Sequence, residues 1–250
     1  MNPTSRPSSS LTNAEAIHAW EAGADLVGDF DEQGDGARRW LLNPTIFALL
    51  GEPKGRRILD AGCGQGYLCR LLARREARVT GVEPTSPFYA AAVAAEESDP
   101  LGIEYVRADL STLSATHPHL LGAFAVVIAN MVLMDIPAYE AAIHSCSAAL
   151  APGGIFICTL SHPCFEESSA AWLEKRSIAT HDYLHLTVRE QRISYLFHRP
   201  LSHYVNALLD AGFTLRRMVE PQLSEEGAEA LGNDRDLYVP SFVALSLLKG

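Results

Sequence analysis

The sequence has little positive charge and no long apolar run. Among its 250 residues, 20 are Lys or Arg and 30 are Asp or Glu, which gives a formal net charge of −10. This balance disfavours a nucleic-acid partner and favours a neutral or cationic small molecule. No stretch approaches the roughly 20 apolar residues of a membrane span, and the first ten residues, MNPTSRPSSS, lack the apolar segment of a signal peptide. We therefore expect a cytoplasmic protein that binds neither nucleic acid nor membrane.

Paired cysteines are also lacking. The five cysteines form an odd count, and no two of them have the C-x-x-C spacing, which favours a reducing compartment and free thiols. In the segment CTLSHPC, the side chains of Cys158, His162 and Cys164 can share a strand face. However, Pro163 interrupts that strand and the sequence offers no fourth ligand nearby. We expect no metal site.

Short apolar runs alternate with amphipathic segments along most of the chain. Strand patterns occupy residues 57–61, 78–83, 103–107, 123–129, 154–161, 213–219 and 237–248, and helical patterns occupy residues 66–76, 86–97, 137–150 and 201–211. This alternation is typical of a mostly parallel α/β sheet with helices on both faces. The last two strands follow each other directly, so we expect them to pair as a hairpin at a sheet edge.

Two stretches interrupt the alternation. Residues 14–50 carry several aromatic side chains, and residues 163–200 contain the segments HDYLHLT and RISYLFHR, which can form a hairpin. Open α/β sheets bind ligands at the carboxyl ends of their strands, so both stretches are expected to wall a substrate pocket there. A thicker core or a homodimer contact is the alternative. We expect a single domain with a disordered start (1–12), an N-terminal cap (14–50), a cofactor-binding core (51–162), a substrate lid (163–200) and a C-terminal helix with strands (201–250).

A glycine-rich turn carries the main functional signal. In RILDAGCGQGYLCRLLA, residues 57–73, Gly62, Gly64 and Gly66 stand where an apolar strand becomes an amphipathic helix. Glycine permits close ligand approach, and a helix start offers unpaired N–H groups to an anion. The third glycine comes one residue too early for the dinucleotide pattern G-x-G-x-x-G, and the P-loop pattern is absent. The turn therefore favours a small molecule other than NAD or a P-loop nucleotide.

With Asp60 before it and Glu83 at the end of the second strand, the turn resembles that of class I S-adenosylmethionine-dependent methyltransferases. The later segments VRADL, VVIANMVLMDI and LAPGGIFICTLSHP are similar to this family's motifs in order and spacing. FHRPLSHYVNALLDAGF resembles the C-terminal helix of small-molecule members, including natural-product methyltransferases. The resemblance covers nearly the whole chain. It implies a Rossmann-like, seven-stranded, mostly parallel sheet with its last strand antiparallel, accompanied by N-terminal helical and inserted lid segments, and S-adenosylmethionine as cofactor.

The resemblance also implies roles for individual residues. Glu83 offers two carboxylate acceptors to a ribose diol. Asp109 can accept from the adenine amino group, or instead cap a helix at 111–115, and Asp60 can face the methionine ammonium directly or through water. The expected cofactor-binding residues are Asp60, Gly62, Gly64, Gly66, Glu83, Pro84, Asp109, Leu110, Asn130 and Met131.

The methyl group of the sulfonium is already activated, so alignment of the acceptor and exclusion of water can suffice for transfer. A hydroxyl or carbon acceptor benefits from a base as well. His162 ends the fifth strand and His198 precedes the last helix, so both are expected near the transferred methyl group as catalytic residues. A structural role is the alternative for each.

We predict methyl transfer to oxygen, nitrogen or carbon of a small-molecule acceptor, in bacterial secondary metabolism. The fourth strand leads into NMVL, without the N/D-P-P-Y of base-amino methylation, and Pro163 and Cys164 follow the fifth strand, whereas cytosine-C5 enzymes carry Pro-Cys after the fourth. Both observations disfavour a nucleic-acid substrate, while a protein acceptor stays open. The alternatives are a non-catalytic S-adenosylmethionine-binding or interaction module and, less favoured, a nucleotide-dependent oxidoreductase.

Overall fold

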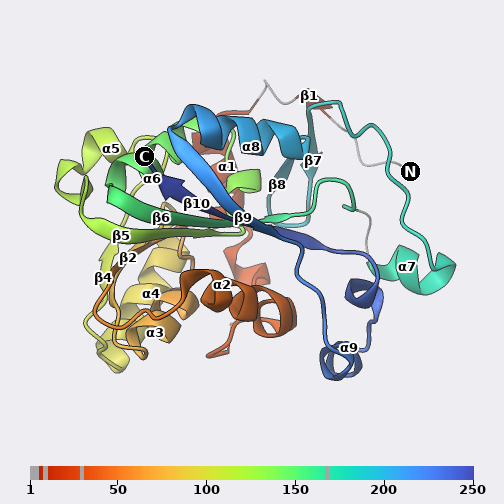
Figure 1. The fold of residues 1–250 in the computed structure, drawn as a ribbon, viewed down its shortest axis with the longest axis horizontal. Coiled ribbons are helices and arrows are strands. Elements are labelled where there is room, and N and C mark those ends of the chain that lie inside the picture. The colour runs from red at the N-terminus through yellow and green to blue at the C-terminus, as the bar shows by residue number, and fades with distance from the viewer. Residues whose placement is uncertain (1–5, 8–10, 29–30, 167–168) are drawn as a thin grey trace.

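The computed structural model describes residues 6–7, 11–28, 31–166 and 169–250, and its centre is one seven-stranded sheet (Figure 1). The strand order is β4-β3-β2-β5-β6-β10-β9. All neighbours from β4 to β6 pair in parallel, whereas β10 runs antiparallel to both β6 and β9. This arrangement confirms the predicted fold. The strands are β2 (Arg57–Ala61), β3 (Arg78–Val82), β4 (Glu104–Val106), β5 (Phe124–Asn130), β6 (Leu150–Ser161), β9 (Phe213–Val219) and β10 (Phe242–Lys249).

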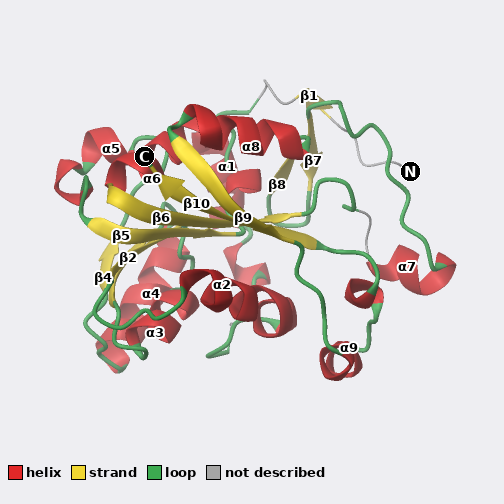
Figure 2. Cartoon of the chain, in the orientation of Figure 1, coloured by secondary structure: helices red, strands yellow, loops and turns green. Residues whose placement is uncertain are grey.

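Helices cover both faces of the sheet (Figure 2). One face carries α2 (Asn43–Leu50), α3 (Tyr67–Ala73) and α4 (Ser86–Ser98), and the other carries α5 (Leu113–Thr116), α6 (Tyr139–Ala149) and α8 (Leu201–Asp210). Successive side chains of the central strand β5 point to opposite faces of the sheet. Val127 packs into the hydrophobic core on one face, and Val126 packs into the hydrophobic core on the other face. Burial on both faces explains why β5 is apolar throughout rather than alternating. No helix in the described ranges is long and apolar enough to cross a membrane.

The N-terminal segment and the insertion meet in an accessory layer. Helix α1 (Asn13–Ala22) begins with a capping box, in which the Thr12 side chain accepts from the Glu15 amide and Glu15 accepts from the Thr12 amide. It packs on a small sheet of order β1-β7-β8, through Ala16, Val188 and Phe197. The small sheet comprises β1 (Arg6–Pro7), β7 (Thr187–Glu190) and β8 (Tyr195–His198), and the short helix α7 (Ser169–Lys175) precedes it in the insertion.

Several boundaries differ from the sequence prediction. The last strand starts at Phe242 instead of residue 237, because Pro240 lacks an amide hydrogen and the preceding residues form α9 (Glu225–Leu231) and the 3₁₀ turn η6 (Arg235–Leu237). The last two strands do pair, and β9 is the edge strand. The insertion hairpin exists, but its first strand begins at Thr187. Of the start predicted to be disordered, residues 1–5 and 8–10 lie outside the described residues, and Arg6–Pro7 pair with β7.

Short 3₁₀-helical and π-helical segments, near the site and at the periphery, complete the described part of the chain. They are η2 (Ala24–Leu26), the π-helical η3 (Arg38–Leu42), η4 (Pro118–Leu120) and η5 (Leu133–Asp135). Two of them, η3 and η5, contribute side chains to the cavity described below.

Candidate functional site

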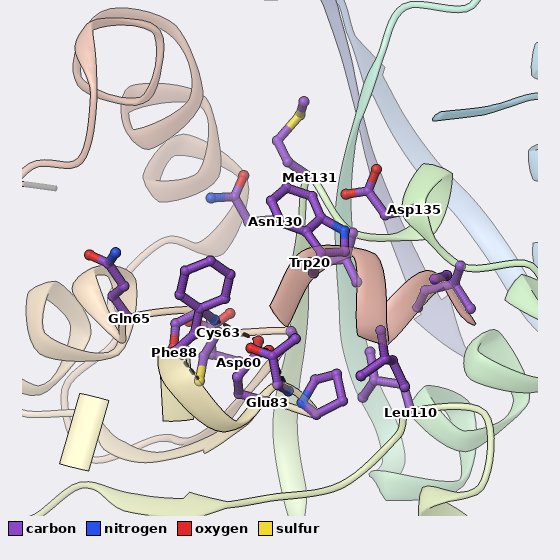
Figure 3. Close-up of a pocket in the computed structure, with 18 of the residues that line it drawn as sticks. Trp20, Asp60, Cys63, Gln65, Glu83, Phe88, Leu110, Asn130, Met131 and Asp135 are labelled. Carbon is purple, nitrogen blue, oxygen red and sulfur yellow. Dashed lines mark hydrogen bonds between the residues drawn. The ribbon is translucent and has the colours of Figure 1, made fainter. Parts of the chain in front are cut away.

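A cavity of about 330 Å³ lies at the carboxyl ends of β2, β3 and β5, where an open parallel sheet binds ligands (Figure 3). Its walls contain nearly all of the cofactor-binding residues expected from the sequence. Gly66 is the exception, because it does not line the cavity. The expected residues that do line it are Asp60, Gly62, Gly64, Glu83, Pro84, Asp109, Leu110, Asn130 and Met131.

The three glycines of the turn after β2 all have positive φ angles, but they do different things. A Cβ at Gly62 would lie 2.7 Å from the side chain of Val132, and one at Gly66 would collide with the hydroxyl of Tyr105. These two glycines are therefore required by protein packing. At Gly64, with φ of 55°, no described atom lies within 4 Å of the Cβ position. The turn thus leaves open space at Gly64, on the cavity wall, as a closely held ligand requires.

Glu83, directly after β3, connects this turn to the next strand. Its Oε2 accepts from the Gly64 amide at 3.0 Å, and its Oε1 accepts from the amide and hydroxyl of Thr85 at 2.9 and 2.7 Å. Burial raises the pKa of Glu83, while these hydrogen bonds oppose the increase. A carboxylate has about four acceptor positions, so both oxygens retain capacity for hydroxyl groups of a ligand.

Asp60 is buried near the end of β2 and also faces the cavity. The thiol of Cys69 donates to its Oδ2 at 3.2 Å. Burial, with a smaller contribution from the charge of Glu83, raises the pKa of Asp60 to about 7. A carboxylate in such surroundings is strongly stabilised by an approaching cation. Two carboxylate acceptors and an open glycine turn therefore fit a ligand that carries both a cation and hydroxyl groups, such as S-adenosylmethionine.

Asp109 forms a hydrogen bond like that of a helix cap, the alternative role considered for it in the sequence analysis. Its Oδ1 accepts from the Ser111 amide at 2.8 Å, which stabilises the turn before α5, although α5 begins at Leu113. The same carboxylate accepts from Asn13 at 3.2 Å, and Asn13 accepts from the Ala138 amide at 2.9 Å. Asp109 thus both lines the cavity and holds the start of α1 over it.

Outside the sheet and its turns, the cavity is lined mostly by the N-terminal cap predicted at residues 14–50. The lid predicted at residues 163–200 contributes little to the lining. Ile17 and Trp20 of α1 line the cavity, together with Ala16, Val27 and Arg38 from the same N-terminal segment. Within the described part of residues 163–200, only Ile193 does so. Trp20 packs edge-on against Phe88 of α4, with ring centroids 6.2 Å apart. These wall residues were not predicted individually, although the capping box before an aromatic helix signals an ordered segment.

The two histidines predicted as catalytic do not line the cavity. His162 is buried and interacts through Nε2 with Glu220 at 3.0 Å, while its Nδ1 accepts from the Cys164 amide at 3.2 Å. His198 lies between Glu166, 2.8 Å from Nδ1, and the Tyr183 carbonyl, 2.9 Å from Nε2. Every ring nitrogen already has a protein partner. Neither histidine is therefore placed at this cavity, and the catalytic role expected of them stays a prediction.

A polar network fixes the end of β5. Asn130 donates to the hydroxyl of Tyr67 and accepts from the hydroxyl of Thr159, each at 2.7 Å. Met131 follows with a φ of 61°, a conformation rare for a side chain of this size, and its amide donates to the Thr159 hydroxyl at 3.0 Å. Backbone strain held in place by hydrogen bonds is common at ligand sites. Tyr67 also lines the cavity, a role that its helical position did not reveal.

Comparisons with known proteins agree with this geometry. A family model described as a methyltransferase domain matches residues 35–217. The ubiquinone biosynthesis O-methyltransferase of Psychrobacter arcticus is 33% identical over 160 residues, which cover 63% of this chain and 51% of that protein. The chain thus spans about half the length of this curated relative.

Solved structures agree with the fold. An S-adenosylmethionine-dependent methyltransferase from Mesorhizobium loti superposes with a TM-score of 0.74 at 25% identity, covering 88% of this chain and all of that one. The [4+2]-cyclase SpnF superposes with a TM-score of 0.67 at 16% identity, covering 98% of this chain and 99% of that one. At this identity the second likeness shows a shared fold alone.

Proposed function

The chain belongs to the S-adenosylmethionine-dependent methyltransferases, and on this premise we propose that it transfers a methyl group to a hydroxyl oxygen of a small, largely apolar acceptor. The family match over residues 35–217 confirms the enzyme class predicted from the sequence, and the likeness to the S-adenosylmethionine-dependent methyltransferase from Mesorhizobium loti supports the predicted cofactor. It also removes the nucleotide-dependent oxidoreductase considered there. The acceptor, the residue roles and the place in metabolism are proposals.

The observation that carries the proposal is that the cavity wall is acidic in one part and largely apolar in another. The carboxylates of Glu83 and Asp60 stand together beside the glycine turn, whereas much of the remaining wall is apolar (Figure 3). Glu83 is suited to the ribose and Asp60 to the ammonium of the cofactor. The apolar side chains of Trp20, Ile136 and Ile193 then favour an acceptor with a hydrocarbon or aromatic body.

Oxygen is the proposed acceptor atom because the curated relative from Psychrobacter arcticus is an O-methyltransferase and is 33% identical over 160 residues. The cofactor supplies an electrophilic methyl group when it is bound. The protein must then align the acceptor oxygen with that carbon and exclude water. Helix α1 suits the second task because Trp20 covers the cavity and the Ser86 amide holds the helix through Glu21 at 2.9 Å.

Three narrower expectations from the sequence belong to the proposal. Bacterial secondary metabolism remains the predicted setting, the cytoplasm the predicted location and a homodimer an open alternative to the monomer. The acceptor class does not depend on any of these three.

The proposed function is tested with a panel of acceptors that share an aromatic body and differ in the reacting atom. Substituted phenols, anilines and cyclic 1,3-dicarbonyl compounds are each incubated with the protein and S-adenosylmethionine. We expect S-adenosylhomocysteine to form in step with methylated product for phenols. Transfer to anilines or carbon acids alone would replace the proposed acceptor atom, and the absence of any methylated product would favour a non-catalytic S-adenosylmethionine-binding module.

A further inference from the structure

Asp135 is a carboxylate in the cavity wall that neither the cofactor motifs nor the packing of the fold explains. It ends η5, five residues after β5, and lines the same cavity as Glu83. Figure 3 shows its carboxylate on the opposite side of the view from Gln65 of the glycine turn. Within the described part of the chain, no hydrogen bond to its side-chain oxygens is found. Its acceptor capacity is therefore available to a ligand.

The turn that carries Asp135 is held from behind by Arg199. This buried guanidinium donates to the carbonyls of Leu133, Ile136 and Pro137 at 3.3, 2.8 and 3.1 Å. It also stacks on the ring of Tyr139 at 4.0 Å. A planar guanidinium with several fixed donors gives a rigid anchor. Arg199 is thus a positioning residue, because it fixes the backbone on both sides of Asp135 while leaving the carboxylate open to the cavity.

The electrostatic surroundings make this carboxylate a competent base. Burial raises the pKa of Asp135 to about 8, although the positive charges of Arg38 and Arg199 oppose the increase. The two cations come from η3 and from the segment after β8 respectively, and the titratable Tyr204 of α8 also interacts electrostatically with Asp135. A base with a pKa near the working pH combines proton affinity with a substantial ionised fraction. Perturbed carboxylates in a cavity are common at catalytic sites.

We propose that Asp135 is the catalytic base that accepts the proton of the acceptor hydroxyl during methyl transfer. This inference rests on the proposed function and extends it. The hydroxyl oxygen forms a bond to the methyl carbon, and the carbon–sulfur bond breaks with its electron pair left on sulfur. The hydroxyl proton passes to the Asp135 carboxylate and is released to water after the products leave. Asp135 therefore performs the task expected of His162 or His198 from the sequence.

The test compares Asp135→Asn with wild type and with Glu140→Gln, a matched loss of one carboxylate at an exposed position outside the cavity lining. With a phenol that wild type methylates, Asp135→Asn should lower kcat by about 10² to 10⁴, the usual contribution of a general base. Its KM for the phenol and its affinity for S-adenosylhomocysteine should stay within about threefold, because the Asn side chain keeps the shape of the wall. Glu140→Gln should match wild type in all three quantities.

The pH dependence separates a base from a structural residue. In wild type, kcat/KM should rise with pH through about 8, as the Asp135 carboxyl loses its proton. In Asp135→Asn this rise of kcat/KM with pH should be absent. Asp135→Glu, which keeps a carboxylate, should show the rise and should be faster than Asp135→Asn. An independent reading is the carboxyl ¹³C titration of the unliganded enzyme, in which one resonance that shifts near pH 8 should be absent from Asp135→Asn.

Other outcomes of these experiments would contradict either the role of Asp135 or the proposed function. Asp135→Asn with the wild-type rate and pH profile overturns the role of Asp135 and leaves the proposed function intact. Lost affinity for S-adenosylhomocysteine in a folded Asp135→Asn protein also overturns it, since the residue would then serve cofactor binding. Wild type that methylates anilines but no phenol overturns both the hydroxyl acceptor and the need for this base.

Discussion

The Oε2 atom of Glu83 accepts a hydrogen bond from the backbone amide of Gly64 at 3.0 Å. The acid at the end of β3 therefore orients the open glycine of the turn after β2, in addition to offering acceptors of its own. With the role proposed for Glu83, ribose recognition and placement of the glycine turn are coupled through this one contact. Changes at either residue should consequently affect cofactor affinity, for different physical reasons.

Replacement of Glu83 by Gln should weaken S-adenosylhomocysteine binding by about 10- to 100-fold, because hydrogen bonds to a charged group contribute roughly 1.5–3 kcal/mol each. The amide also presents a donor where Gly64 and Thr85 already donate. Isothermal titration calorimetry measures the affinity, and Glu97→Gln on the exposed surface of α4 is the control. Unchanged affinity in a folded Glu83→Gln variant would show that this acid does not hold the ribose.

Gly64→Ala should abolish or strongly reduce binding while the protein stays folded. The methyl group of the new alanine would contact no described atom of the protein. It would instead occupy space at the cavity wall that a bound ligand needs. Gly102→Ala is the matched control, because Gly102 also has a positive φ and open space but lies in an exposed loop away from the cavity. Each change carries a backbone cost of about 1–2 kcal/mol. Equal affinity in the two variants would assign the turn a purely structural role.

Cofactor affinity should increase with pH up to about pH 7 and then level off. Burial chiefly raises the pKa of Asp60 to about 7, and an ammonium bound beside it lowers that pKa, so binding below pH 7 releases a proton. Calorimetry of S-adenosylhomocysteine binding in buffers with different ionisation enthalpies counts this proton. Asp60→Asn should bind more weakly and release none. A wild-type affinity that decreases toward pH 7 would place the ammonium elsewhere.

The ion pair between His198 and Glu166 should make stability depend on pH. Burial opposes the imidazolium, but the Glu166 carboxylate and the Tyr183 carbonyl outweigh it, so the pKa of His198 is raised. The pair stabilises the fold fully below the unfolded pKa of about 6.5, and this stability is lost as pH rises through the folded value. The decrease in Tm between pH 6 and about pH 9 should be smaller for His198→Gln. Equal slopes in wild type and His198→Gln would exclude the charged pair.

The sheet and the cavity wall around the glycine turn were predictable because short-range patterns determine them. A buried strand such as β5 must be apolar on both faces, and a turn such as that at Gly64 must lack a side chain, so both leave local signals. Glu83 follows from its place at a strand end. These features depend on few long-range contacts.

The acceptor side was not predictable in the same way. Asp135 lies within the apolar segment VVIANMVLMDI, and its exposure to the cavity depends on the η5 turn that Arg199 anchors from a distant part of the chain. His162 illustrates the converse, because closeness to a strand end does not specify which way a side chain points. Its partner Glu220 lies 58 residues further along the chain. Contacts between residues far apart in the sequence therefore determine the orientation of both Asp135 and His162.

The most direct test of the central claim follows the methyl group itself. The protein is incubated with S-adenosylmethionine that carries a deuterated methyl group and with the phenol that gives the highest turnover, and the product is examined by mass spectrometry and NMR. The account predicts that the intact deuterated methyl group appears on the phenolic oxygen, with one S-adenosylhomocysteine formed for each product molecule. Label on ring carbon, or S-adenosylmethionine bound tightly by a folded protein but left unconsumed with every acceptor of the panel, would contradict it.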